Sequence, residues 1–250
     1  MKKKIIAMLL LVAVICSLAA CGSKKADLTI TKGVLTMSTN AAFPPYEMTN
    51  DKGGFEGIDV EIADAIAKKL GLTLQIDDME FDAALLAAQQ GKSDIVMAGV
   101  TVNADRQLVM EFSNSYATGT QVVIVPEGSE ITLDTLGNYT IGTQRATTGN
   151  IYCTDDFGED HVVAYDNGIT AVQALVNGQI DCVVIDSAPA AAFVASNPGL
   201  TILETEYVTE NYAIGMAKGN TALLEAINKA LDELTADGTI QAIVDKYIAA

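Results

Sequence analysis

The chain has 250 residues, enough for one large domain or two of moderate size. Half of the residues are hydrophobic, which is sufficient for a packed core and excludes wholesale disorder. The formal charge of −17 repels nucleic-acid phosphates, so we expect no nucleic-acid partner.

The first twenty residues have the pattern of an export signal. Three lysines precede an apolar run, which ends in small residues before Cys21. This predicts a signal peptide over 1–20 and a short polar tether over 21–26. The apolar run is barely long enough to span a bilayer, so an uncleaved anchor is the alternative. In both cases we expect an acidic module outside the cytoplasmic membrane.

Strands and helices alternate after the tether. Ile62, Ile66 and Leu70 recur at helical spacing, and Gly71 follows them, which predicts a helix that ends at this glycine. A turn is expected at 51–54. Alternating or continuous apolar runs predict strands over 29–40, 72–79 and 93–100, and a second helix is expected over 82–92.

The alternation continues in the second half, so two α/β units are predicted in series. Strands are expected at 120–129, 161–166 and 180–188, with helices at 169–179 and 189–199 and a strand–turn–helix unit over 139–153. A strand and two further helices follow from residue 213, and Leu224, Ile227, Leu231 and Leu234 form the apolar stripe of the first. Such alternation predicts largely parallel sheets covered on both faces.

Besides Cys21, the predicted mature chain contains two cysteines, Cys153 and Cys182. An oxidising compartment would allow them to form a disulfide. The alternative is a pair of buried free thiols, because cysteine packs like a small hydrophobic residue. Neither has neighbours at metal-binding spacing, so no metal is expected.

Catalytic motifs are absent from the sequence. It contains no P-loop, no dinucleotide-binding glycine pattern and no nucleophile elbow. The single histidine, His161, lies in an acidic stretch without a nucleophile motif. We therefore expect neither an enzyme nor a cofactor.

Arg106 is one of only two arginines in the chain. It lies in the first turn of a predicted short helix, with Asn103 as the N-cap, directly after a buried strand. Ligands of open α/β sheets bind beyond the carboxyl ends of strands, and a guanidinium matches a carboxylate bidentately. Arg106 could therefore hold a small anion; the alternative is a surface ion pair with Glu111 or Asp105.

Other candidate ligand groups follow strands at equivalent places. Thr147 and Thr148 precede or open a helix, whose free backbone N–H groups favour anions, although ordinary helix capping is the alternative. Asp186 ends a buried strand and could accept an ammonium group or cap the next helix. Aromatic rings that could flank a ligand or fill the core are Phe43, Tyr46 and Phe81. Together these groups suit a zwitterion with an α-carboxylate and an α-ammonium.

Several motifs resemble the polar amino-acid family (family 3) of extracellular solute-binding proteins, which serve ABC importers. They occur in family order from about residue 30 to the C-terminus: GIDVEIADAIAKKL (57–70), FDAALLAAQQGKSDIVMAGVTVNADRQ (81–107), EFSNSY (111–116) and GQIDCVVID (178–186). LAAC (18–21) resembles a lipobox, which implies that Cys21 is lipidated and anchors the protein to the cell membrane. Two or more acyl chains hold a protein stably on a membrane.

The resemblance implies a two-lobed type II periplasmic-binding fold with the ligand cleft between the lobes. Lobe 1 is expected at 27–117 plus 212–250, lobe 2 at 122–207, and the hinge at 118–121 and 208–211. The implied partners are a free amino acid and an ABC permease, and we expect a monomer. The same fold also serves as a cyclohexadienyl dehydratase and as the sensor domain of receptors, which are the alternatives.

Residue roles are also implied by the resemblance. Arg106 would bind the ligand carboxylate with the backbone N–H groups of Thr101 and Thr148. Asp186 would bind the ammonium with the Gly99 carbonyl.

The side-chain end of the site follows from the same resemblance. Phe43 and Phe81 would pack on the ligand side chain, with Thr147 nearby. Ala98 replaces a common serine and removes one hydroxyl contact. Asn40 stands where several members carry an acid, which favours glutamine or another uncharged polar side chain, whereas Glu80 would restore a preference for cations.

Overall fold

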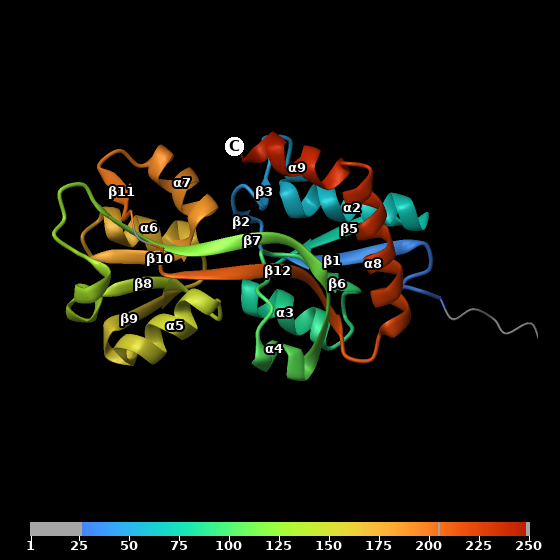
Figure 1. The fold of residues 1–250 in the computed structure, drawn as a ribbon, viewed down its shortest axis with the longest axis horizontal. Helices are drawn as coiled ribbons and strands as arrows, with labels where there is room; N and C mark the ends of the chain where they lie inside the picture. Colours follow the sequence, from blue (N-terminus) through green and yellow to red (C-terminus); the bar gives the residue numbers. More distant parts are fainter. Residues whose placement is uncertain (1–26, 205, 249–250) are drawn as a thin grey trace, which may run out of the picture.

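The computed structural model describes residues 27–204 and 206–248, so the predicted signal peptide, tether and Cys21 lie outside the described residues. The described elements form two groups joined by two long strands (Figure 1). We call these groups lobe 1 and lobe 2. The two-lobed α/β fold predicted from the sequence is confirmed.

Lobe 1 contains the N-terminal elements and the two C-terminal helices. Its strands are β1 (Val34–Thr39), β2 (Ala42–Phe43), β3 (Glu47–Thr49), β4 (Phe55–Glu56), β5 (Thr73–Asp78) and β6 (Ile95–Val96). Its helices are α2 (Ile58–Leu70), α3 (Phe81–Gln89), α4 (Ala104–Val109), α8 (Thr221–Ala236) and α9 (Thr239–Tyr247). In Figure 1, α2, α8 and α9 lie on one side of the sheet, and α3 and α4 on the other.

Lobe 2 contains the elements between the two long strands. Its strands are β8 (Ile141–Gln144), β9 (Val162–Tyr165), β10 (Cys182–Asp186) and β11 (Leu200–Ile202). Its α-helices are α5 (Thr148–Phe157), α6 (Gly168–Val176) and α7 (Ser187–Ser196), with short 3₁₀ turns at Leu133–Asn138 and Glu159–His161. Helix α5 covers one face of these strands, and α6 and α7 cover the other (Figure 1).

The two long strands are β7 (Met110–Pro126) and β12 (Val208–Ala217), which pair antiparallel side by side along the middle of the molecule (Figure 1). They join strands of both lobes into one sheet in the order β5-β1-β6-β12-β7-β10-β8-β9, with β11 beside β7, whereas β2, β3 and β4 form a separate small sheet. The predicted hinge segments 118–121 and 208–211 lie within these strands. Within these segments, Gly119 of β7 pairs with Glu210 of β12.

The sheet differs from the prediction of largely parallel strands. The outer pairs β1–β5, β1–β6, β8–β9 and β8–β10 are parallel, whereas every pair that includes β7 or β12 is antiparallel. The strand 110–126 also begins ten residues before the predicted one. Its first part carries polar and half-buried side chains, so hydrophobic patterning did not mark it.

The predicted helices agree with the structure where the hydrophobic periodicity of the sequence is strong. Helix α2 ends at Gly71, whose φ of 71° is the left-handed conformation that glycine adopts at helix ends. In α8 the predicted stripe residues Ile227, Leu231 and Leu234 are buried, whereas Leu224 is only partly buried and Leu223 takes its place.

Cys153 and Cys182 are both buried free thiols in the structure. They pack in one hydrophobic cluster of lobe 2 with Val123, Leu136 and Val184. This is the second of the two alternatives derived from the sequence. Burial raises the pKa of each thiol to about 12, so both stay protonated near neutral pH.

Candidate ligand-binding site

The ten residues predicted to contact a ligand line a single cavity between the lobes. The cavity encloses about 320 Å³, including its open mouth. Lobe 1 contributes Asn40, Phe43, Phe81, Ala98, Gly99, Thr101 and Arg106, and lobe 2 contributes Thr147, Thr148 and Asp186. Two residues that were not predicted, Glu47 and Gln144, complete the lining.

Arg106 is held by backbone groups from both lobes. Asn103 caps α4 as predicted, because its side chain accepts a hydrogen bond from the Arg106 N–H at 2.8 Å. The guanidinium donates to the Thr101 carbonyl at 2.8 Å and, across the cleft, to the Ala146 carbonyl at 3.1 Å. It also lies 5.4 Å from the centre of the Phe81 ring.

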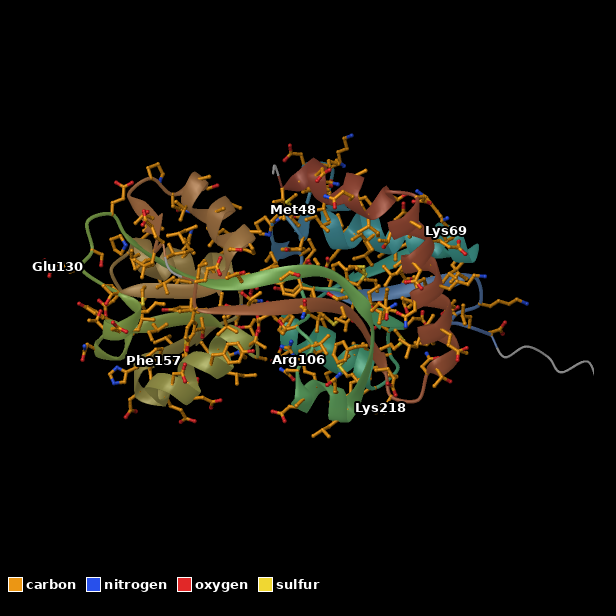
Figure 2. All side chains as sticks on the ribbon, viewed as in Figure 1. Met48, Lys69, Arg106, Glu130, Phe157 and Lys218 are labelled. Atoms are coloured by element: carbon orange, nitrogen blue, oxygen red, sulfur yellow. The ribbon has the colours of Figure 1, made fainter. Side chains whose placement is uncertain are left out.

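Arg106 forms no ion pair with any residue that the structure describes, so the predicted alternative of a surface ion pair with Glu111 or Asp105 is wrong. Glu111 instead pairs with Lys218. Figure 2 shows Arg106 near the middle of the molecule, away from the outer surface that carries Lys69 and Glu130. Burial lowers the pKa of the guanidinium, and the negative charge of Glu210 opposes that shift.

The lobe 2 wall opposite Arg106 is the N-terminus of α5. Thr147 caps this helix by accepting from the Asn150 N–H, and the Thr148 hydroxyl lies 3.3 Å from the Thr101 hydroxyl across the cleft. Helix N-termini carry partial positive charge and free N–H groups. The two sides together therefore form an anion-binding corner next to the guanidinium.

Asp186 occupies the N-cap position of α7, but its side chain does not cap the helix. The carboxylate instead accepts a short hydrogen bond from the Tyr212 hydroxyl of β12. Burial is the main cause that raises the pKa of Asp186 to about 7, and the hydrogen bond from Tyr212 partly opposes the shift. An added Cβ at Gly119 would lie 2.0 Å from the Tyr212 hydroxyl, so only glycine leaves room for this contact.

The remaining wall carries neutral amides and aromatic rings. Gln144 of lobe 2 donates to the Asn40 side-chain oxygen at 3.0 Å, while the Asn40 amide donates to the Met79 carbonyl at 2.9 Å. Both amide side chains are buried. Glu80, at the exposed rim, has its pKa raised by partial burial and by the nearby negative charge of Asp166.

Several residues of the site were not predicted from the sequence. Gln144 is the last residue of β8 and the first of the segment QRATT, and its position at the end of a strand was the available signal. Tyr212 and Glu210 lie on β12, whose side chains reach the site only because this strand crosses between the lobes. Glu210 accepts from the side chains of Gln121 and Tyr152.

Metal-ligand clusters and membrane-spanning helices are absent from the described part of the chain. No three His, Cys, Asp or Glu residues in the described ranges are arranged to hold a metal ion. His161 is half-buried at the start of β9, in lobe 2, and is not in the cavity. Within 27–204 and 206–248, no helix has the length and apolar character needed to cross a membrane.

A two-lobed α/β fold with polar, oppositely charged groups facing one interlobe cavity defines a periplasmic-type binding protein. The chain belongs to the bacterial extracellular solute-binding proteins, family 3, whose profile matches residues 35–250. Members of this family bind solutes and are not enzymes, so the dehydratase alternative has no support.

The relatives agree with this assignment. The chain is 33% identical to a probable histidine-binding protein of Neisseria gonorrhoeae, over 93% of this chain and 91% of the relative. It is 28% identical to the arginine-binding extracellular protein ArtP of Bacillus subtilis, over 98% of both chains. A solved structure of an ancestral arginine-binding protein bound to glutamine is 37% identical, with a TM-score of 0.83 over 88% of this chain and all of that chain.

Proposed function

We propose that this protein binds a free polar amino acid in the interlobe cavity and delivers it to an ABC importer permease. The observation that carries the proposal is the placement of Arg106 and Asp186 on one cavity, each supplied by a different lobe. Similar proteins named for histidine, arginine and cystine binding support an amino acid as the ligand.

The two charged ends of an amino acid match the two charged groups of the cavity. The ligand carboxylate would accept from the Arg106 guanidinium and from the backbone N–H groups of Thr101 and Thr148, next to the positive end of α5. The ligand ammonium would donate hydrogen bonds to the Asp186 carboxylate and to the Gly99 carbonyl. Charged hydrogen bonds of this kind are about twice as strong as neutral ones.

Contacts across the cleft support closure around the ligand. Hydrogen bonds already link Arg106 to Ala146, Thr101 to Thr148 and Asn40 to Gln144. A ligand that adds further bridges binds the closed state better than the open state and so shifts the population towards it. The permease would then recognise the closed form. The proposed hinge is 118–121 with 208–211, between lobe 1 at 27–117 plus 212–250 and lobe 2 at 122–207.

The side-chain end of the cavity favours an uncharged polar ligand such as glutamine. Asn40 and Gln144 present neutral amide groups there, and Phe43 and Phe81 supply apolar contact. At the rim, Glu80 offers a carboxylate that could neutralise a cationic side chain. An ancestral relative has been crystallised both with glutamine and with arginine, so the two ligands should be compared directly.

A thermal-shift screen against the twenty amino acids tests the proposal. A ligand present at a hundred times its dissociation constant stabilises the folded state by about 2.7 kcal/mol, which raises the melting temperature by several degrees. We expect glutamine among the strongest ligands. If none of the twenty stabilises the protein, the proposed function is wrong.

We also propose that the protein is a monomer anchored outside the cytoplasmic membrane by lipid on Cys21. The support is the LAAC pattern at 18–21, which precedes the described residues. Growing cells with labelled palmitate tests this proposal. Label is expected on the wild-type chain and not on Cys21→Ser, and equal labelling of both would contradict the anchor.

A further inference from the structure

Glu47 is a buried carboxyl group that the proposed function does not use. It begins β3, its residue is 0% exposed, and it lines the cavity. Asp59, in the first turn of α2, is also 0% exposed. Both oxygens of Glu47 and Oδ1 of Asp59 have no hydrogen-bond partner among the described residues. Three buried carboxyl oxygens without a partner call for an explanation, because such groups are normally hydrogen-bonded.

The backbone brings the two carboxyl groups together. The N–H groups of Ile58 and Asp59 donate to the carbonyls of Pro45 and Tyr46, at 3.0 and 2.8 Å. This close approach requires Gly57, because a Cβ at that position would lie 2.2 Å from the Tyr46 carbonyl oxygen. The start of α2 is therefore fixed against the residues that precede Glu47.

Asp59 is the member of the pair that is ionised. Its Oδ2 accepts from the Gly99 N–H at 3.0 Å and from the Tyr116 hydroxyl at 2.8 Å. Two donors on one oxygen favour the charged carboxylate. Gly99 is itself part of the cavity wall and has a φ of 55°, a left-handed conformation that glycine adopts readily, so Asp59 fixes this turn in the proposed ligand site.

The surroundings of Glu47 oppose a second negative charge. The charged or titratable groups that face it are all acidic or hydroxyl groups, namely Asp59, Asp186, Asp78, Tyr46 and Tyr116. Burial, and then the negative charge of Asp59, raise the pKa of Glu47 well above its usual range. Burial of an uncompensated ion costs several kcal/mol, whereas one shared proton satisfies both acids.

We propose that Glu47 is a positioning residue, which stays protonated and donates its proton to Oδ1 of Asp59. Asp59 in turn holds the Gly99 turn against the bound ligand. The role in binding rests on the proposed function, whereas the shared proton does not. Ligand affinity should fall when Glu47 ionises at high pH. The carboxylates of Glu47 and Asp59 would then repel each other, and movement of Asp59 would displace Gly99.

Two substitutions of Glu47 separate this role from its alternatives. In Glu47→Gln the amide N–H replaces the acid proton as donor to Asp59, so the Kd for L-glutamine and L-arginine should stay within about threefold of wild type at pH 7. In Glu47→Leu the donor is lost, and an unpaired buried acceptor should weaken binding about tenfold or more. Asp64→Asn, on the exposed side of the same helix, is the control and should change nothing.

Calorimetry at pH 7 and at higher pH gives decisive outcomes. The proposal predicts that the affinity of the wild type falls relative to that of Glu47→Gln as the pH rises. The titration of the ligand itself affects both proteins equally, so it does not change the ratio of their Kd values. If Glu47 were an ionised partner of the ligand ammonium, Glu47→Gln would lose as much affinity as Glu47→Leu. If Glu47 only filled space, all three proteins would bind equally. Either result would overturn the proposal.

Infrared spectroscopy tests the proton without any ligand. At pH 7 the difference spectrum of wild type minus Glu47→Gln should contain a protonated-carboxyl band, whereas the difference between wild type and Asp64→Asn should not. The band of Asp186, which titrates near pH 7, is common to all three proteins and cancels in these differences. Exchange of the Gly99 amide proton should be slow in wild type and in Glu47→Gln. Absence of the band, or unchanged Gly99 exchange in a folded Glu47→Leu protein, would overturn the proposal even if no amino acid bound.

Discussion

The two walls of the cavity hold their charged groups in different ways. On lobe 1, Arg106 is fixed by a capped helix and by two carbonyl acceptors, and a guanidinium keeps its charge throughout the physiological range. On lobe 2, Asp186 is held by a neutral hydroxyl, and burial raises its pKa to about 7. The comparison indicates that Arg106, which would bind the ligand carboxylate, keeps its charge at all physiological pH values. Asp186, which would bind the ligand ammonium, acquires its negative charge only near neutral pH.

The largest expected effect comes from Arg106→Ala. This substitution removes the cation that faces the ligand carboxylate, and loss of one partner of a buried charged pair costs on the order of 3–5 kcal/mol. Calorimetry with L-glutamine and L-arginine should show Kd increased at least a hundredfold, with the circular dichroism spectrum unchanged. A Kd within tenfold of wild type would remove Arg106 from the site.

Asp186→Asn should have the next largest effect. The amide keeps the size of the side chain and an acceptor for the Tyr212 hydroxyl, but it loses the negative charge that would balance the ligand ammonium. Truncation of such pairs costs roughly 2–5 kcal/mol, and we expect the lower part of this range for an isosteric change. The measurement is again the Kd at pH 8, where wild-type Asp186 is ionised. Unaltered affinity would place the ammonium elsewhere.

Affinity should also depend on pH below neutrality. In the absence of ligand Asp186 titrates near pH 7, and a bound ammonium favours its ionised form, so binding releases a proton at lower pH. The affinity should therefore fall as the pH is lowered from 8 to 6, by up to about tenfold per unit below the free pKa. Asp186→Asn should lose this dependence. A flat wild-type profile would show that the carboxylate is already ionised without ligand.

The smallest effect is expected from Arg145→Ala, the other arginine of the chain. Its side chain is 52% exposed and pairs with Asp166 at 3.1 Å outside the cavity lining. Exposed ion pairs contribute at most about 1 kcal/mol, so the Kd should change less than about threefold. A loss comparable to that of Arg106→Ala would mean that the charge of the rim, rather than the buried guanidinium, determines binding.

The sequence was sufficient for those features that depend on local rules. Asn103 was predicted as a helix cap, and capping was the alternative role considered for Thr147. Both residues cap their helices, and a side chain that accepts from its own helix needs no information from elsewhere in the fold. The end of α2 at Gly71 follows from the same kind of rule. The ten proposed ligand residues could be assigned to one cavity in advance because the family resemblance supplied the topology, which the residues alone did not.

Features that depend on contacts between distant segments could not be predicted. The first part of β7 is polar and half-buried, so its extension became visible only beside β12. Tyr212 contacts Asp186, 26 residues away in the chain, because β12 crosses between the lobes. Glu47 lies in a predicted loop, and its burial near Asp59 depends on how α2 meets the residues before β3.

A crystal structure of the protein with bound L-glutamine or L-arginine tests the central claim most directly. We predict that the ligand carboxylate lies within hydrogen-bonding distance of the Arg106 guanidinium and the ammonium within the same distance of the Asp186 carboxylate, in a single closed cavity. A ligand that contacts neither group, or a structure in which the two side chains face separate regions of solvent, would contradict the account.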